Sequence, residues 1–380
     1  MFDQGNDAGS ELCSEARVPD RRLLDRSGGG RRRQRHRGVR FLTWPDQRPV
    51  GTFTLPDVID PVLLDWLLDS DPALRWQVER DLVRAPEEVW RATRARVETD
   101  GFGARLLALE DPDGQWAAGA FFPGDFDPEG PEAAEDAGQP WTATTWSLNS
   151  LREWGLDASV LSGTAELLAA NSRWEYENLP YWGGEVDCCI NAYTLANGAW
   201  LGADVSGIVD WFVEHRLPDG GWNCEWTAGS ARSSFHSTLN SLNGLLWYEN
   251  LTGATNITRE ARRGGEEYLL QRGLYRRLST GEPVGPWATE FAYPFRWVYS
   301  VLNAADYFRA AALADDRPPD PRMAEAIGQI RAARRPDGTW VQAARHPGRV
   351  WFEVDVPVGE PSRWLTFYAI RVLEWWDATR

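Results

Sequence analysis

The sequence predicts an all-α fold, an (α/α)6 toroid in which six helical hairpins stack and close into a barrel. Two observations predict it. From Leu55 onward, apolar residues recur at helical spacing, with almost no strand-type alternation. One turn signature also recurs three times, as DPDGQW, LPDGGW and RPDGTW, each time after a predicted helix and ending in Trp116, Trp222 or Trp340. Repeated helical units bury their apolar faces by stacking on their neighbours, so a closed ring of hairpins is the expected architecture.

The first 50 residues differ from the rest of the chain in composition. They contain the run GGGRRRQRHR and little apolar periodicity. A segment of this kind has too little apolar surface to offset the conformational entropy that folding removes. We therefore expect residues 1–50 to be a disordered basic N-terminal arm and residues 51–380 to form the toroid, which would be the catalytic domain.

The inner helices of the hairpins are predicted from their first turns. The first begins at Asp71-Pro72, where an N-cap residue is followed by proline. Five later helices have related starts: PWTATTWSL, VDCCINAYTL, SFHSTLNSL, PFRWVYSVL and PSRWLTFYAI. When these starts are aligned, one register position is occupied by Thr144, Cys189, His236, Trp297 and Trp364. In the turns between hairpins, Asp-Gly supplies the tight bend, and each tryptophan is expected to fold back over the helix ends.

Composition argues against several partners and compartments. The formal net charge of −16 argues against nucleic acid or an anionic membrane surface as the main partner. No run of 18 apolar residues is present, so no transmembrane segment is expected, and the N-terminus lacks the apolar core of a signal peptide. Four cysteines, two of them adjacent, do not suggest a disulfide framework in 380 residues. We expect a cytoplasmic protein.

The stretch from Trp182 to Glu249 contains most of the residues that could carry chemistry. Within it, Asp187, Cys189 and His236 form a candidate zinc-ligand set of one carboxylate, one thiolate and one imidazole. Cys189 and His236 share a level on neighbouring inner helices, whose axes should lie about 8–10 Å apart, so both side chains could reach one ion.

The other two cysteines of this stretch have different expected roles. Cys224 is a candidate fourth ligand. Four protein ligands would indicate a structural site, whereas an open fourth position would indicate catalysis. Cys188 is expected to point elsewhere and to pack in the core, because adjacent side chains leave a helix about 100° apart.

The repeated turns and the six-hairpin pattern resemble the terpene cyclase and protein prenyltransferase superfamily. The tryptophan turns are similar to the QW motifs of squalene–hopene cyclases, and the resemblance covers roughly residues 55–380. It implies an (α/α)6 barrel whose apolar central cavity holds an isoprenoid chain. Trp297 and Trp364 would line that cavity, where aromatic faces stabilise carbocations, and Thr144 would lie at the same level.

One branch of this superfamily, the β subunits of protein farnesyl- and geranylgeranyltransferases, binds zinc through Asp-x-Cys and a histidine on the next inner helix. The resemblance carries these roles to Asp187 and Cys189 in VDCC and to His236 in SFHSTLNSLNGL. The diphosphate-binding Arg and Lys upstream of the zinc Asp are missing here. The candidate replacements, suited to bidentate phosphate contacts, are Arg232, Arg296 and Arg363. An α-like partner subunit is not implied.

The other branch, the class II cyclases, carries a DxDD motif whose middle Asp protonates an alkene or epoxide. The segment EVDC keeps the first acid as Glu185 and the third residue as Asp187, and it lacks the last acid. On this reading Asp187 is the general acid and Glu185 is its neighbouring carboxyl group, with no metal bound.

Three functions therefore remain open from the sequence. The first is a zinc-dependent enzyme of the prenyltransferase-like branch that acts on an apolar, isoprenoid-type substrate. The second is a metal-free cyclase that uses Asp187. The third is a non-catalytic scaffold that binds an apolar ligand. Metal content separates the first from the second, and turnover of any isoprenoid separates both from the third.

Overall fold

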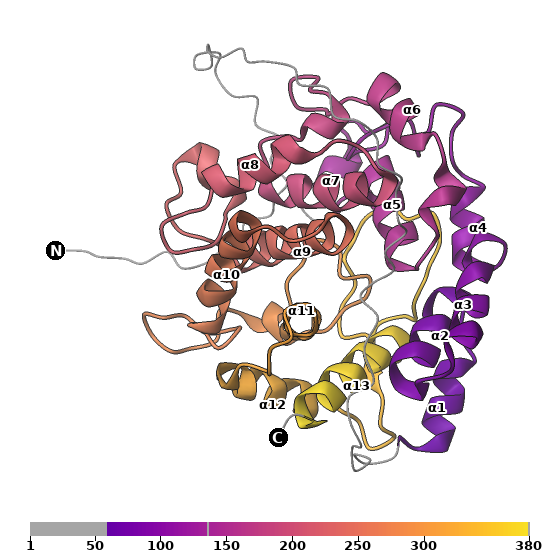
Figure 1. The fold of residues 1–380 in the computed structure, drawn as a ribbon, viewed down its shortest axis with the longest axis vertical. Helices are drawn as coiled ribbons and strands as arrows, with labels where there is room; N and C mark the ends of the chain where they lie inside the picture. Colours follow the sequence, from indigo (N-terminus) through magenta and orange to yellow (C-terminus); the bar gives the residue numbers. More distant parts are fainter. Residues whose placement is uncertain (1–58, 135–136, 379–380) are drawn as a thin grey trace.

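The computed structural model describes residues 59–134 and 137–378, and over these residues the protein is mainly helical (Figure 1). It contains thirteen α-helices and one short antiparallel ladder, β1 (Trp340–Val341) with β2 (Pro361–Ser362). The predicted all-α class is confirmed for this part of the chain. The predicted arm, residues 1–50, lies outside the described residues. Within them, no helix combines the length and the apolar character that crossing a membrane requires.

The helices range in length from seven residues in α2 and α4 to eighteen in α9. Their bounds are α1 Pro61–Leu68, α2 Pro72–Val78, α3 Glu87–Ala95, α4 Gly101–Leu107, α5 Thr144–Glu153, α6 Thr164–Asn171, α7 Cys188–Leu201, α8 Ser206–Glu214, α9 Phe235–Thr252, α10 Asn256–Leu270, α11 Val301–Ala314, α12 Ala324–Ala332 and α13 Arg363–Ala378.

The three repeated turns make the same hydrogen bonds. Each indole Nε1 donates to the carbonyl ten residues upstream, in the helix before the turn: Trp116 to Leu106 (2.9 Å), Trp222 to Phe212 (2.9 Å) and Trp340 to Ile330 (2.8 Å). Each tryptophan peptide N–H donates to a threonine hydroxyl of the next helix: Thr144, Thr238 or Thr366. All three indoles are buried. Each turn therefore ties the end of α4, α8 or α12 to the beginning of α5, α9 or α13.

The capping residues correct the predicted register of the inner helices. The hydroxyls of Ser234 and Ser300 cap α9 and α11, and that of Ser362 accepts from Leu365 in the first turn of α13. The residues two positions after Ser234, Ser300 and Ser362 are His236, Leu302 and Trp364. These three residues therefore occupy equivalent positions in their helices. Trp297 does not share their level, because α11 begins only at Val301 and the preceding segment includes Arg296 in the left-handed region, at φ 53°.

Thr144 is also displaced from its predicted register position. Its hydroxyl receives the Trp116 peptide N–H, as Thr238 receives that of Trp222. Thr144 therefore corresponds to Thr238, which lies two residues after His236. The predicted register was wrong here because it rested on the apparent starts of the helices. The hydrogen bonds of the tryptophan turns show which residues of the following helices correspond.

Helices α5, α7, α9, α11 and α13 follow one another in contact, and the first described helices contact both ends of this series (Figure 1). The Trp76 indole of α2 donates to the carbonyl of Trp154, just after α5 (2.7 Å). At the other end, Arg371 of α13 donates to Asp81 (3.2 Å), and Arg363 donates to the carbonyl of Trp66 in α1 (2.9 Å). The start and the end of the described chain are thus joined by buried or half-buried polar contacts.

Candidate metal centre

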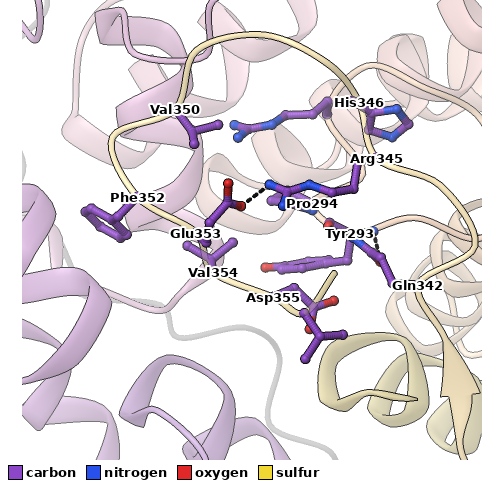
Figure 2. A pocket seen from close by; sticks show the side chains of 12 residues that line it. Tyr293, Pro294, Gln342, Arg345, His346, Val350, Phe352, Glu353, Val354 and Asp355 are labelled. Atoms are coloured by element: carbon purple, nitrogen blue, oxygen red, sulfur yellow. Dashed lines mark hydrogen bonds and ion pairs between the residues drawn. The ribbon is translucent and has the colours of Figure 1, made fainter. Parts of the chain in front are cut away.

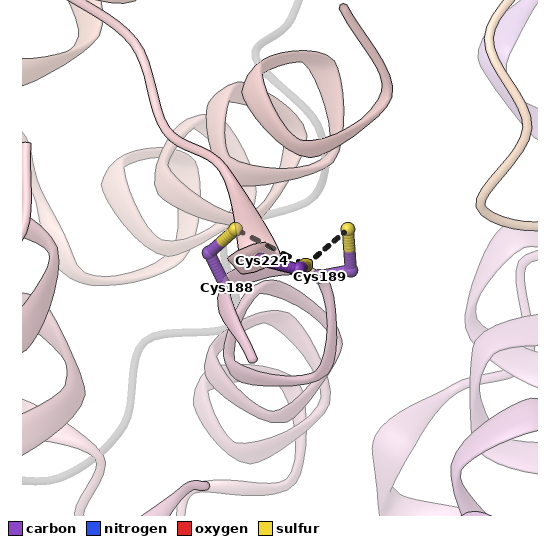
Figure 3. A group of neighbouring side chains, drawn as sticks. All are labelled: Cys188, Cys189 and Cys224. Carbon is purple, nitrogen blue, oxygen red and sulfur yellow. Dashed lines mark hydrogen bonds between the residues drawn. The ribbon is translucent and has the colours of Figure 1, made fainter. Parts of the chain in front are cut away.

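Three buried cysteine sulfurs meet at the beginning of α7 (Figure 3). Cys188 and Cys189 are the first two residues of α7, and Cys224 lies in the loop before α9. The Cys224 Sγ is 3.4 Å from the Sγ of Cys188 and 3.4 Å from that of Cys189. All three sulfurs lie within 4.8 Å of one another. The three side chains are therefore positioned to share one ligand.

The expectation that Cys188 points elsewhere is wrong. The two adjacent cysteines do leave the helix in different directions, but Cys224 lies between them and its sulfur reaches both (Figure 3). Helical periodicity describes one helix alone and gives no information about a residue that approaches from another segment. The proximity of Cys188 to Cys224 is a tertiary contact.

The loop that carries Cys224 is held in place by hydrogen bonds on both sides. The Cys224 peptide N–H donates to the hydroxyl of Ser237 in α9 (3.2 Å). The Trp226 indole donates to the carbonyl of Val186, just before α7 (2.8 Å). The Asn223 side chain caps the 3-10 turn and donates to the carbonyl of Arg232 (2.8 Å). The loop thus spans from α7 to α9 and positions the third sulfur.

Polar groups of α9 surround the Cys189 sulfur. The Asn240 amide Nδ2 donates to the Cys189 Sγ (3.4 Å), and the Ser237 hydroxyl lies 3.8 Å from it. Burial and the two neighbouring thiols raise the pKa of Cys188 well above its usual value. Without a cation the cluster therefore favours protonated thiols, whereas a metal ion would displace the protons.

Two carboxyl groups lie just before the cysteines. Asp187 is the residue before α7, but its side chain does not cap the helix. Its peptide N–H donates to the Glu185 carboxyl group (2.7 Å). Burial, together with Cys224, Glu185 and Glu225, raises the pKa of Asp187 to about 9. Burial also raises the pKa of Glu185, to about 7. Asp187 therefore holds its proton at neutral pH, whereas Glu185 titrates close to that pH.

His236 is the second residue of α9 and packs among aromatic rings. Its ring centroid lies 4.7 Å from that of Trp287 and 5.7 Å from that of Trp297. Burial lowers the pKa of His236 to about 4, so the imidazole is neutral. Within the described ranges, the three thiols form the one group of three or more metal-ligating side chains whose donor atoms all lie within 4.8 Å, and neither His236 nor Asp187 belongs to it.

The other predicted binding residues have identifiable structural contacts. The Thr144 hydroxyl donates to the Gly119 carbonyl (2.6 Å). Trp364 is 3% exposed and stacks on Tyr293, at 4.4 Å between ring centroids. Arg363 lies over the Trp66 ring, and Arg232 is exposed. These four therefore hold the fold together or face solvent, and the structure does not place them with the thiols.

Trp297 and Arg296 lie closer to the interior. The Trp297 indole donates to the Gln139 side chain (3.2 Å), and its carbonyl accepts from the Asn240 amide (2.9 Å). The same Asn240 amide also contacts Cys189, so the Asn240 side chain lies between Trp297 and the thiols. Arg296 is half-buried, and burial lowers its pKa to about 10.

Glu153, at the end of α5, interacts electrostatically with Arg296. Its side chain is accessible, yet burial raises its pKa. Arg152, its neighbour, has a pKa lowered by burial to about 10. Sequence reasoning missed both residues, although a charged Arg-Glu pair inside the SLREWG segment of an inner helix was a visible signal.

A small polar cavity adjoins Arg296 (Figure 2). Its volume of about 20 Å³ is enough for one water molecule. Arg345 and Glu353 pair across it, and burial raises the pKa of Asp355 to about 6. The Gln342 amide exchanges two hydrogen bonds with the Tyr293 backbone (3.0 and 2.6 Å). This cavity is too small and too charged to hold an isoprenoid chain.

Comparison with known proteins gives little further guidance. No family model matches the chain, and no curated protein sequence matches it. A crystal structure of a protein from Actinoplanes aligns with 82% of this chain and 90% of that chain, at 19% sequence identity and a TM-score of 0.38. A likeness of that size carries no argument about function, so the site is interpreted from its own geometry.

Proposed function

We propose that the protein is a zinc-dependent enzyme built on a closed (α/α)6 toroid, with Cys188, Cys189 and Cys224 as the metal ligands. The observation that carries this proposal is the meeting of three buried thiols from two separate segments. Thiolates are preferred ligands of zinc, and buried cysteines grouped in this way are typical of metal sites rather than of ordinary core packing. The contacts of α1 and of Asp81 with α13, and of α2 with the residue after α5, support the closed ring.

The spacing of the sulfurs suits a zinc ion. With Zn–S bonds of about 2.3 Å, tetrahedral geometry puts the sulfurs roughly 3.8 Å apart. The two 3.4 Å separations would need to open by only about 0.4 Å. Three protein thiolates leave a fourth position open, which is the arrangement of catalytic rather than structural zinc sites. Cys224 acts electrostatically on both Asp187 and His236, which makes these two side chains the candidates for that position.

The surrounding residues have separate roles in this proposal. Asn240 donates to the Cys189 sulfur and so stabilises its thiolate form. Ser237 supports both Cys189 and the Cys224 loop. His236 stays neutral among its aromatic neighbours. The chemistry that zinc supplies in such a site is Lewis-acid polarisation or activation of a bound thiolate.

The substrate class proposed is an apolar, isoprenoid-type molecule. Its support is the resemblance of the tryptophan turns together with the clusters of aromatic side chains, among them those of Trp287 and Trp297 around His236. Three free thiols also fit a reducing compartment, which supports a cytoplasmic location. The proposal requires no prenyltransferase α-like subunit.

Metal analysis tests this function directly. Purified protein is expected to contain about one equivalent of zinc by elemental analysis. Cys188→Ala, Cys189→Ala and Cys224→Ala should each lower the content at least tenfold, since a site with three ligands cannot easily lose one. Cys13→Ala, which changes the chain's remaining cysteine, is the matched control and should keep the full equivalent. Wild-type protein that is metal-free and does not take up added zinc would refute the proposal.

A second candidate function is a metal-free cyclase in which Asp187 is the general acid. The observation that favours it concerns the residue before α7, Asp187. Its side chain does not cap the helix, and its pKa is raised to about 9, so it keeps its proton at neutral pH. Only the protonated form can donate, so turnover should persist through neutral pH and fall as the pH rises through about 9.

The variant Asp187→Asn tests this second candidate. The amide is isosteric but cannot donate a proton to an alkene, so turnover of an isoprenoid substrate should be lost while the circular dichroism spectrum is unchanged. Glu225→Gln is the control, because this exposed carboxyl group acts on Asp187 only electrostatically. An active Asp187→Asn enzyme would eliminate the cyclase mechanism.

A further inference from the structure

The three buried thiols are not equivalent, because Cys224 contacts both of the others. Its Sγ lies 3.4 Å from that of Cys188 and 3.4 Å from that of Cys189, and it is placed between them (Figure 3). An S–S bond is about 2.05 Å long, so either pair needs its sulfurs to approach by roughly 1.4 Å. Cys188 and Cys189 leave α7 about 100° apart and do not pair with each other while the helix is intact. A disulfide in this cluster therefore includes Cys224.

Polar neighbours distinguish Cys189 from Cys188. The Cys189 Sγ receives the Asn240 amide Nδ2 (3.4 Å) and lies 3.8 Å from the Ser237 hydroxyl. Within the part of the chain that the structure describes, the Cys188 sulfur has only the other two thiols as hydrogen-bonding partners. Oxidation adds a polar oxygen atom to a sulfur, and a buried polar atom is costly unless it is hydrogen-bonded. Cys189 has the groups that satisfy such an atom, whereas Cys188 lacks them.

The cluster lies directly beneath a surface turn. Cys224 begins the five-residue 3-10 turn Cys224–Ala228, and three of these five residues are exposed. The Trp226 indole holds the turn to the Val186 carbonyl (2.8 Å), and the Cys224 peptide N–H donates to the Ser237 hydroxyl (3.2 Å). Short surface segments with few buried contacts open locally at a much lower free-energy cost than the core. Opening of this turn therefore gives a small oxidant access to the sulfurs while α7 and α9 stay folded.

We propose that Cys189 and Cys224 form a reversible disulfide when the protein meets a hydroperoxide, and that Cys188 stays a thiol. The bond would link the first turn of α7 to the turn before α9 and would remove two of the three ligands of the metal site. This inference concerns the regulation of that site, and it rests on the proposed function only for the release of zinc.

The reaction balances with hydrogen peroxide as the oxidant. The Cys189 sulfur attacks one peroxide oxygen, so that an S–O bond forms, the O–O bond breaks, and the other oxygen leaves as water with the thiol proton. The Cys224 sulfur then attacks the sulfur of this sulfenic acid. The S–S bond forms, the S–O bond breaks, and a second water leaves with the Cys224 proton. The two thiols thus lose two electrons and two protons, and the peroxide is reduced to two water molecules.

The disulfide and a bound zinc ion exclude each other. A sulfur in a disulfide is no longer a thiolate, so Cys188 would be the one remaining cysteine ligand, and one thiolate does not make a zinc site. Oxidation would therefore release the ion. Thiol–disulfide exchange with a small dithiol reverses the bond and restores the ligands.

Thiol titration and peptide mapping test the proposal on the full chain. The Cys13→Ala protein keeps three of the chain's four cysteines. After metal removal by a chelator and treatment with hydrogen peroxide, it should lose two of its three titratable thiols, and mass spectrometry should find the Cys189–Cys224 linkage. Dithiothreitol should restore all three thiols. Adding Cys188→Ala should leave this linkage in place, whereas adding Cys189→Ser should abolish disulfide formation.

A second pair of variants tests the route of access. Trp226→Phe removes the indole N–H that holds the turn to Val186, so the disulfide should form about fivefold faster. Trp351→Phe is the matched control. It also removes an indole hydrogen bond, to the Thr142 carbonyl, in a different part of the fold, and it should leave the rate unchanged.

Three outcomes would overturn the inference. These are no disulfide in folded protein at a peroxide dose that oxidises free cysteine, a Cys188–Cys224 linkage in place of the expected one, and an unchanged rate in Trp226→Phe. The zinc proposal fails separately. Protein that forms the disulfide but never binds zinc would refute only the metal site, and protein that holds zinc but forms no disulfide would refute only this inference.

Discussion

Replacing Arg262 by methionine should destabilise the protein by about 3–5 kcal/mol, because three buried carboxyl groups would lose their shared cation. Arg262 is fully buried in α10 and donates to Glu249 (2.8 Å), Glu266 (2.6 Å) and Asp315 (2.8 Å). These partners come from α9, from α10 itself and from the residue after α11, so the cluster ties three consecutive elements together. Urea denaturation would measure the loss as a lower midpoint.

An exposed ion pair provides the matched control for Arg262. Arg331 and Asp377 form a pair whose side chains are 47% and 41% exposed. Arg331→Met should therefore cost less than about 1 kcal/mol. Adding Glu249→Gln to Arg262→Met should recover part of the loss, since one unpaired buried charge is removed. Equal costs for the Arg262 and Arg331 substitutions would show that the buried cluster is not a major source of stability.

Trp222→Ala should also cost about 3–5 kcal/mol, through the cavity it leaves and the lost connection between α8 and α9. The indole is 1% exposed and donates to the Phe212 carbonyl, and the Trp222 peptide N–H is received by Thr238. Thermal denaturation followed by circular dichroism would measure the change. Trp222→Phe should have a smaller effect, because it retains most of the volume and loses only the indole N–H.

Trp351 is the corresponding control for a tryptophan at the surface. It is 36% exposed and donates to the Thr142 carbonyl (3.0 Å). Trp351→Ala should cost roughly 1 kcal/mol, about the value of its hydrogen bond. If Trp222→Ala were as mild, the recurring turn would be a sequence pattern without a structural role.

The parts of the fold that could be predicted are those encoded by local sequence. The four residues of the Asp-Gly-x-Trp pattern all lie in one turn, so the pattern is local. Its tryptophans were correctly expected to cover helix ends. The beginning of α11 was not predictable in this way. The segment PFRW has the composition of a helix start, but the left-handed backbone at Arg296 and the cap at Ser300 delay the helix to Val301.

The candidate site was predicted in part for the same reason. Cys189 and Cys224 were proposed as ligands, and both belong to the cluster of sulfurs. Cys188 was missed because its relation to Cys224 depends on a loop from another hairpin. Arg152 was missed although the charged pair in SLREWG is visible in the sequence, because the lack of an acceptor for its Nη1 is a property of the folded interior. Whether Asp187 and His236 approach a bound metal stays a prediction.

The contacts between the two ends of the described chain have a consequence for folding. Arg363 reaches Trp66, and Arg371 reaches Asp81, across almost 300 positions of sequence. In a linear array of helical repeats each unit depends only on its neighbours, and the end units can fray independently. Here a very long loop must close before these contacts form, and closing it costs conformational entropy. The first and last helices should therefore dock late and together, so that shortening the chain at either end weakens the opposite one as well.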